Sequence, residues 1–160
     1  MAIKLNVAAH DIHLQDFINL DNDPNMAPDR LLDCTKLTEY YERDSVDFIY
    51  CGHFLEHIKY RESLDVVRSF HAILKPYACC VAVIPDYAKA PAGAESAERI
   101  ILGDFDHKCL YDSPRLLKTF REAGFTAWSV DVRDLPWCRF PEVIWQSAVI
   151  GIKHPRVEFK

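Results

Sequence analysis

Short apolar runs recur along the chain and alternate with stretches of mixed polarity. Several runs are rich in β-branched or aromatic residues and end in a polar residue, as buried strands of a parallel sheet do. The strands predicted in this way lie at residues 3–8, 17–21, 30–33, 47–51 and 78–84. Such an alternation favours an α/β domain with helices on both faces of a sheet.

Two of the intervening stretches show helical spacing. Apolar residues recur every three to four positions in residues 61–74, which predicts an amphipathic helix that Lys75 and Pro76 end. A second helix is predicted from Ser113 as N-cap, with Pro114 in its first turn, to Gly124 past its last turn. Residues 126–132 and 143–152 should form a closing antiparallel pair, because the link between them is too short for a helical crossover.

Composition and charge bound the class of protein. The 160 residues are 49% hydrophobic and 27% charged, which fits one domain over residues 1–160. A net charge of −5 gives no reason to bind a phosphate backbone, so nucleic acid is not expected as a bulk partner. No apolar run reaches the ~18 residues of a membrane span, and no leader is apparent. The six cysteines show neither the spacing of a disulfide framework nor a CxxC pair. These features favour a soluble, cytoplasmic protein.

Polar residues gather directly after the strand at 47–51. This strand is followed by Gly52, His53, Glu56 and His57. In open α/β sheets, ligands bind beyond the carboxyl ends of strands, where loops are free of packing duty. We therefore expect the chemistry of the protein at this point.

The same residues match a zinc-binding pattern. His53 to His57 read H-x-x-E-H, in which two histidines on one helical face hold zinc and the glutamate activates water. However, Gly52 places His53 at a strand-to-helix junction, where helical spacing is not assured, and no third ligand stands out in the sequence. No metal is therefore expected.

Several short motifs, in a fixed order over residues 4–152, resemble a known family. They are residues 5–10 (Leu-Asn-Val-Ala-Ala-His), 16–24 (Asp-Phe-Ile-Asn-Leu-Asp-Asn-Asp-Pro), 47–50 (Asp-Phe-Ile-Tyr), 55–57 (Leu-Glu-His), 74–76 (Leu-Lys-Pro), 84–86 (Ile-Pro-Asp), 107–108 (His-Lys) and 122–125 (Glu-Ala-Gly-Phe). The chain resembles the class I S-adenosylmethionine-dependent methyltransferases, and most closely the small bacterial type associated with glycan or lipopolysaccharide modification. The resemblance implies one Rossmann-like domain with a mostly parallel seven-stranded sheet in the order 3-2-1-4-5-7-6.

The resemblance also implies cofactor-binding residues. Asp21 stands where the family has an acidic residue that accepts both ribose hydroxyls, although it could instead open the turn that follows it. Asp33 matches the adenine edge, with helix capping as the alternative. The remaining positions that would line S-adenosylmethionine are Ala8, His10, Cys51, Gly52 and His53.

Methyl transfer to a hydroxyl is assisted by a nearby base that accepts the hydroxyl proton. Histidine suits this role near neutral pH, and His53 is the first candidate and His107 the second. Either could instead be a capping or packing residue.

The first loop departs from the family pattern. Glycines there allow positive φ and close approach to the cofactor, whereas this chain has Ala8, Ala9 and His10. The alanines would be tolerated with ordinary dihedral angles. Two hypotheses follow: an active enzyme with His10 turned outward, or an inactive binding or regulatory module that has lost the cofactor. A dinucleotide-dependent dehydrogenase is weaker, because the chain has no G-x-G-x-x-G turn.

The acceptor should contact two segments. They are residues 86–111, which contain the longest irregular stretch at 86–106, and residues 135–142, with Trp137, Arg139 and Phe140. The aromatic residues offer a surface to a small-molecule or glycan substrate, or equally a contact in a homodimer. An oxygen acceptor is expected from the resemblance alone.

Overall fold

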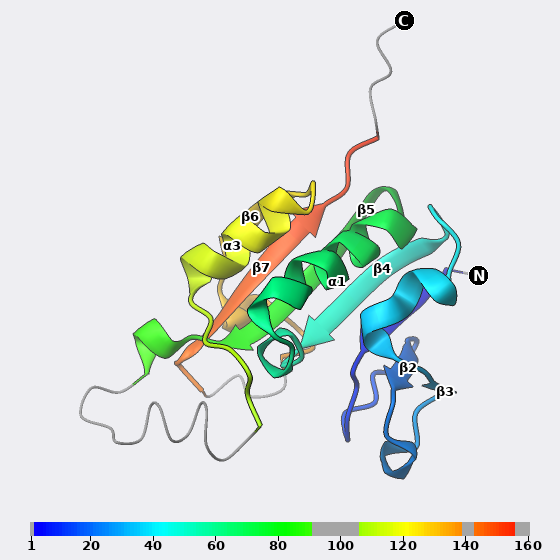
Figure 1. Cartoon of the computed structure of the whole chain (residues 1–160), viewed down its shortest axis with the longest axis horizontal. Helices are drawn as coiled ribbons and strands as arrows, with labels where there is room; N and C mark the ends of the chain where they lie inside the picture. The colour runs from blue at the N-terminus through cyan, green and yellow to red at the C-terminus, as the bar shows by residue number, and fades with distance from the viewer. Residues whose placement is uncertain (1, 91–105, 139–142, 156–160) are drawn as a thin grey trace, which may run out of the picture.

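A seven-stranded sheet forms the centre of the protein. The structure is a computed structural model that describes residues 2–90, 106–138 and 143–155. In the described residues the strand order is β3-β2-β1-β4-β5-β7-β6, as predicted (Figure 1). The strands are β1 (Lys4–Val7), β2 (Ile18–Asp21), β3 (Arg30–Leu31), β4 (Val46–Gly52), β5 (Leu74–Pro85), β6 (Thr126–Val130) and β7 (Gln146–Ile152).

The sheet is mixed, so the expectation of a mostly parallel sheet is wrong. Strands β3, β2, β1, β4 and β5 pair in parallel, whereas β7 runs antiparallel to both β5 and β6. The described part of the link between β6 and β7 contains only a short 3-10 helix, η6 (Val132–Asp134). Without a crossover helix the chain returns antiparallel, and β7 takes the place between β5 and β6.

Two α-helices follow the predicted patterns closely. Helix α1 (Tyr60–Ile73) leads directly into β5, and helix α3 (Ser113–Glu122) ends before Gly124, whose φ of 103° is left-handed. The predicted N-cap of α3 is wrong by one residue. Asp112 takes this place because its carboxylate accepts a hydrogen bond of 2.7 Å from the backbone N–H of Arg115.

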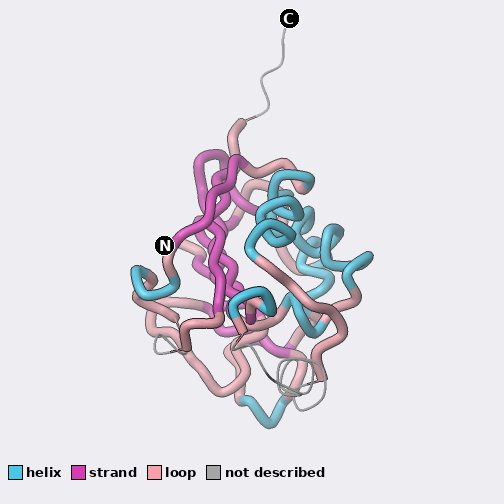
Figure 2. Tube along the Cα trace, turned by 90° about the vertical axis from the view of Figure 1, so that its left-hand side faces the viewer, coloured by secondary structure: helices cyan, strands magenta, loops and turns pink. Residues whose placement is uncertain are grey.

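Both α-helices lie on the same face of the sheet (Figure 2). Their buried residues join the larger core cluster, together with those of the 3-10 helix η2 (Cys34–Glu39). The expectation of helices on both faces therefore holds only in part for the described residues, because the other face carries the short 3-10 helix η6 but no α-helix. The links after β1 and β2 contain turns and the 3-10 helix η1 (Pro24–Met26), because they are too short to return through a packed helix.

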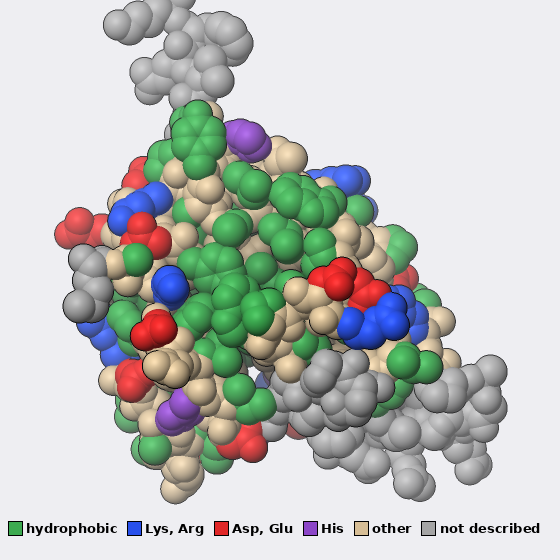
Figure 3. Space-filling view, turned by 180° about the vertical axis from the view of Figure 1, so that it is seen from behind, with side chains coloured by type: hydrophobic (Ala, Val, Ile, Leu, Met, Phe, Trp, Pro, Cys, Tyr) green, Lys and Arg blue, Asp and Glu red, His purple; other side chains and the backbone are tan. Residues whose placement is uncertain are grey.

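Within the described ranges, the opposite face is covered by aromatic side chains and the 3-10 helix η6 rather than by an α-helix. Trp137 packs against Phe17, Phe48 and Tyr50, with ring centroids 5.1–6.1 Å apart. Figure 3 shows that apolar side chains remain visible over much of this face. Residues between β6 and β7 thus replace part of the missing helical layer.

Parts of the two expected substrate segments, residues 91–105 and 139–142, lie outside the described residues. Arg139 and Phe140 are among them.

The remaining short helices in the described residues are η3 (Leu55–His57) and η4 (Tyr87–Lys89). In the described ranges no helix combines the length and the apolar character that crossing a membrane requires.

Candidate active site at the strand ends

The first loop keeps a glycine-like backbone without glycine. Ala8 has a φ of 53° and His10 a φ of 50°, both in the left-handed region that is unfavourable for residues with a Cβ atom. The condition of ordinary dihedral angles is therefore not met at Ala8. The loop adopts the strained form, which costs about 1–2 kcal/mol for a non-glycine residue, although histidine tolerates it better than most.

The ring of His10 points outward, as the hypothesis of an active enzyme requires. Its side chain is 58% exposed, and its Nδ1 atom lies 2.9 Å from Oδ1 of Asp11. The backbone N–H of His10 instead faces the end of β2, where it donates to Asp21. The loop is thus fixed through its backbone and leaves the imidazole at the surface.

Asp21 connects this loop to the turn after β2. One carboxylate oxygen accepts the N–H of His10 at 2.8 Å, and the other accepts the N–H of Asp23 at 3.0 Å. The turn-forming role considered for Asp21 is therefore real. Each oxygen retains a second lone pair, so the buried carboxylate can still accept hydroxyl groups.

Asp33 caps the 3-10 helix η2. Its Oδ1 atom accepts hydrogen bonds from the backbone N–H and the hydroxyl of Thr35, at 2.9 and 2.6 Å. The hydroxyl bond is the main reason why the pKa of the Asp33 carboxyl is lowered. The capping alternative is thus present, and a contact with adenine stays a prediction.

The thiols near the strand ends are packing groups. Burial raises the pKa of Cys34 to about 12, and burial raises the pKa of Cys51 well above its ordinary value. Both side chains belong to the larger core cluster. Cys51 therefore contributes to the site by packing at the end of β4, since its thiolate is strongly disfavoured.

Glycine at the last position of β4 leaves room for the ring of Tyr50. A Cβ atom at this position would lie 2.8 Å from the hydroxyl oxygen of Tyr50. The next residue, His53, has a φ of 54°, and its backbone N–H donates to the carbonyl of Val83 at 2.9 Å. This geometry turns the imidazole of His53 across the carboxyl end of the sheet.

His53 contacts two polar side chains. Its Nε2 atom lies 2.7 Å from Oε1 of Gln146, and its Nδ1 atom lies 3.2 Å from Oε1 of Glu56. The amide of Gln146 is oriented by its own donation to the carbonyl of Val143 at 3.0 Å. His53 therefore donates from Nε2, and Nδ1 is the nitrogen beside the carboxylate.

Glu56, His57 and His107 come together beside this pair. Their possible ligand atoms all lie within 4.8 Å of one another. Glu56 and His57 belong to η3, so the helical spacing that the H-x-x-E-H pattern needs is absent, and His53 turns to Gln146 instead. The structure thus brings His107, the second predicted base, to Glu56 rather than to Asp21.

Comparison with known families decides the class of the protein. The sequence model of a family described as a methyltransferase domain matches residues 5–130. The chain belongs to this methyltransferase family. The expected enzyme class and its cofactor, S-adenosylmethionine, are thereby confirmed at the level of the family. No curated protein matches the methyltransferase chain.

Solved structures share its fold. A S-adenosylmethionine-dependent methyltransferase from Archaeoglobus fulgidus is 14% identical, with a TM-score of 0.72 over 95% of this chain and 86% of that one. Another from Thermotoga maritima is 13% identical, with a TM-score of 0.70 over 96% and 82%. A third similar structure is a complex between the Haloferax volcanii Trm112 methyltransferase activator and a methyltransferase. It is 13% identical, with a TM-score of 0.71 over 99% of this chain and 84% of that one. These similarities show the fold.

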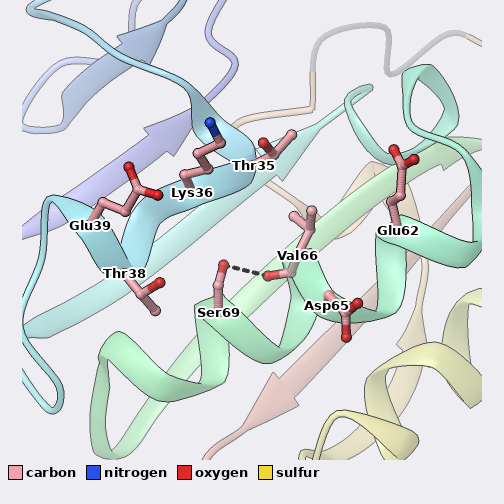
Figure 4. A pocket seen from close by; sticks show the side chains of 8 residues that line it. All are labelled: Thr35, Lys36, Thr38, Glu39, Glu62, Asp65, Val66 and Ser69. Carbon is pink, nitrogen blue, oxygen red and sulfur yellow. Dashed lines mark hydrogen bonds between the residues drawn. The ribbon is translucent and has the colours of Figure 1, made fainter.

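A pocket on the helical face is separate from the predicted site. It lies between η2 and α1, and its side chains are mainly polar (Figure 4). The lining residues are Thr35, Lys36, Thr38, Glu39, Glu62, Asp65, Val66 and Ser69. None of the predicted site residues of the methyltransferase lines it.

Sequence reasoning missed Gln146 and the contact between His57 and His107. Gln146 begins β7, and the antiparallel pairing of that strand with β5 brings it to the carboxyl end of β4. Its only sequence signal is a polar residue at the start of an apolar run. The pairing of His57 with His107 depends on a long-range contact that no local pattern encodes.

Proposed function

We propose that the chain transfers the methyl group of S-adenosylmethionine to a hydroxyl oxygen of a small or glycan-like acceptor at the carboxyl ends of β1, β2 and β4. The observation that carries the proposal is the position of Asp21. Its buried carboxylate joins the first loop to the end of β2 and keeps one lone pair on each oxygen. This arrangement suits a ribose diol.

The surrounding residues fit the rest of the cofactor. The left-handed backbone at Ala8 and His10 gives the tight turn that glycine would give, with the His10 ring outside it. Asp33 would face the adenine, while Cys51 and Gly52 would line the methionine part. When bound, S-adenosylmethionine supplies a methyl group already activated on a sulfonium, so the protein mainly has to orient the acceptor and exclude water.

His53 would act as the base for an acceptor hydroxyl. Its Nε2–H is held by Gln146, so Nδ1 is the nitrogen that would take the hydroxyl proton while the acceptor oxygen bonds the methyl carbon and the methyl–sulfur bond breaks, which would leave S-adenosylhomocysteine. The Glu56 carboxylate, 3.2 Å from Nδ1, would stabilise the imidazolium that results. The oxygen target and the glycan class are part of this proposal, and the resemblance noted in the sequence supports them. The cytoplasmic location rests on the composition and the cysteine spacing, and a homodimer rests on the aromatic residues of segment 135–142.

Calorimetry with S-adenosylhomocysteine tests the cofactor site. Wild-type protein should bind it, and Asp21→Asn should weaken binding at least about tenfold, because an amide nitrogen cannot accept a hydroxyl. Asp65→Asn, an exposed change on α1, should leave the affinity unchanged. Circular dichroism of each variant excludes unfolding as the cause. Absence of binding to folded wild-type protein at millimolar ligand would contradict the proposal and favour a module without cofactor.

A further inference from the structure

We propose that Glu56, His57 and His107 form a binding site for one divalent ion of the Zn²⁺ type. These side chains offer one carboxylate and two imidazoles, and their ligand atoms lie within 4.8 Å of one another. The sequence contains His57 and Glu56 in a recognisable pattern, but the third ligand comes from a distant segment. The structure therefore assigns a different ligand set from the one that the H-x-x-E-H pattern suggests.

The buried carboxylate of Glu56 is the second, independent observation. Its side chain is 1% exposed, and neither oxygen accepts a hydrogen bond in the described part of the chain. One oxygen has the Nδ1 atom of His53 at 3.2 Å, outside good hydrogen-bond geometry, and no described residue offers such a contact to the other oxygen. A buried carboxylate that accepts no hydrogen bond is costly, whereas a coordinated cation would satisfy it.

Backbone contacts hold the two ligand-bearing segments together. The N–H groups of Lys108 and Cys109 donate to the carbonyl of Glu56 at 2.7 and 3.2 Å. The thiol of Cys109 donates to the carbonyl of Ile58 at 3.2 Å. The turn with Glu56 and His57 and the segment with His107 are thus fixed to each other independently of any ion.

The donor set selects the kind of metal. Imidazole nitrogens with one carboxylate suit Zn²⁺ or Co²⁺, whereas Mg²⁺ and Ca²⁺ prefer oxygen ligands alone. A tetrahedral ion about 2.1 Å from each atom would hold the ligand atoms roughly 3.4 Å apart, so the side chains must close by about 1 Å or somewhat more. The rings of His57 and His107 already meet edge to face with centroids 4.6 Å apart. Rotation of partly exposed side chains supplies this closure.

Three protein ligands leave a coordination position open. His53 contacts the same carboxylate, so the open position lies next to the proposed base. An acceptor oxygen bound there would be oriented beside His53 and made more acidic by the cation. This role rests on the proposed function, whereas the binding of the ion does not.

Metal titration of the whole chain tests the site. Protein stripped with a chelator is dialysed against micromolar ZnCl2, and bound metal is measured by mass spectrometry. We expect one Zn²⁺ per chain, an affinity at least tenfold weaker in His107→Asn and in Glu56→Gln, and no change in His154→Asn, an exposed histidine elsewhere. His57→Asn gives a third variant at a partly exposed ligand. Circular dichroism without metal identifies any variant that fails to fold.

Two outcomes would overturn the inference. No stoichiometric Zn²⁺ or Co²⁺ up to 100 μM, or equal binding by wild type and by folded variants at all three ligands, would refute the site. Calorimetry with S-adenosylhomocysteine separates the two proposals. Cofactor binding without metal binding refutes the metal site alone, and metal binding without cofactor binding refutes the proposed function alone.

Discussion

The backbone N–H of His10 donates a hydrogen bond of 2.8 Å to the carboxylate of Asp21. This bond joins the loop after β1 to the end of β2 and turns the backbone of His10 inward while its ring stays outside. The first loop of the methyltransferase therefore keeps its form through a side chain of the next strand. The loop at residues 8–10 contains no glycine, the residue that adopts positive φ without steric strain.

Replacing Ala8 with glycine should stabilise the protein. The φ of 53° at Ala8 strains a residue with a Cβ atom, and glycine relieves this strain. After the larger chain entropy of unfolded glycine is subtracted, the free energy of unfolding should rise by about 0.5–1 kcal/mol. Urea denaturation measures this change. Ala9→Gly is the matched control, since Ala9 has no positive φ, and it should lose about 0.5–1 kcal/mol.

Gly52→Ala should destabilise the end of β4. The new methyl group would lie 2.8 Å from the hydroxyl oxygen of Tyr50, and such overpacking costs about 1–3 kcal/mol. Removing that hydroxyl in Gly52→Ala/Tyr50→Phe should restore part of the loss. Unfolding free energies of the two single variants and the double variant form a cycle. Simple additivity would show that the hydroxyl of Tyr50 is not the cause.

Much of the fold could be predicted because buried strands have local signatures. The strands that contain Val7, Asp21 and Cys51 appear in the sequence as short apolar runs. Their order in the sheet was predicted from the family resemblance, which rests on the order of the motifs. The arrangement of helices could not be predicted in this way. The family resemblance implies a helical layer on each face of the sheet. In this chain the links after β1 and β2 are too short to contain an α-helix, so they contribute none to the second layer.

The candidate site could be predicted only at residues whose place in the sequence is itself a signal. Asp21 stands at a strand tip and His53 after a glycine, so each is visible in the sequence. Gln146 and His107 reach the same place through strand pairing and backbone contacts between distant segments. Their roles follow from geometry, since no periodicity or local motif connects them to His53 or Glu56.

Gln146 should support His53 energetically. Gln146→Leu removes the acceptor that lies 2.7 Å from Nε2 of His53, and loss of such a partner costs about 1–3 kcal/mol. In a background of His53→Phe the same change should cost clearly less, because the donor is gone. Thermal or urea denaturation of the four proteins gives the coupling energy. A coupling near zero would contradict the hydrogen bond.

Acid should weaken the contact between Lys153 and Asp44. Lys153 is almost fully buried, and its ammonium group lies 2.6 Å from the Asp44 carboxylate and 2.7 Å from the carbonyl of Leu74. The hydrogen bond from Lys153 is the main cause that lowers the pKa of Asp44. A lowered pKa in the folded state means that the contribution to stability is complete above the unfolded pKa of about 3.9 and is lost as pH falls through the lower folded value.

Asp44→Asn measures this contribution directly. At pH 7 the variant should be less stable than the wild type, and the difference should shrink as the pH is lowered from 5 towards 2, because the wild type then also loses its charge. Urea denaturation at fixed ionic strength across this range gives the two curves. Lys153 would remain buried without its counter-ion at neutral pH, which is the physical reason for the loss. A difference that stays constant with pH would place the effect in packing rather than in the ion pair.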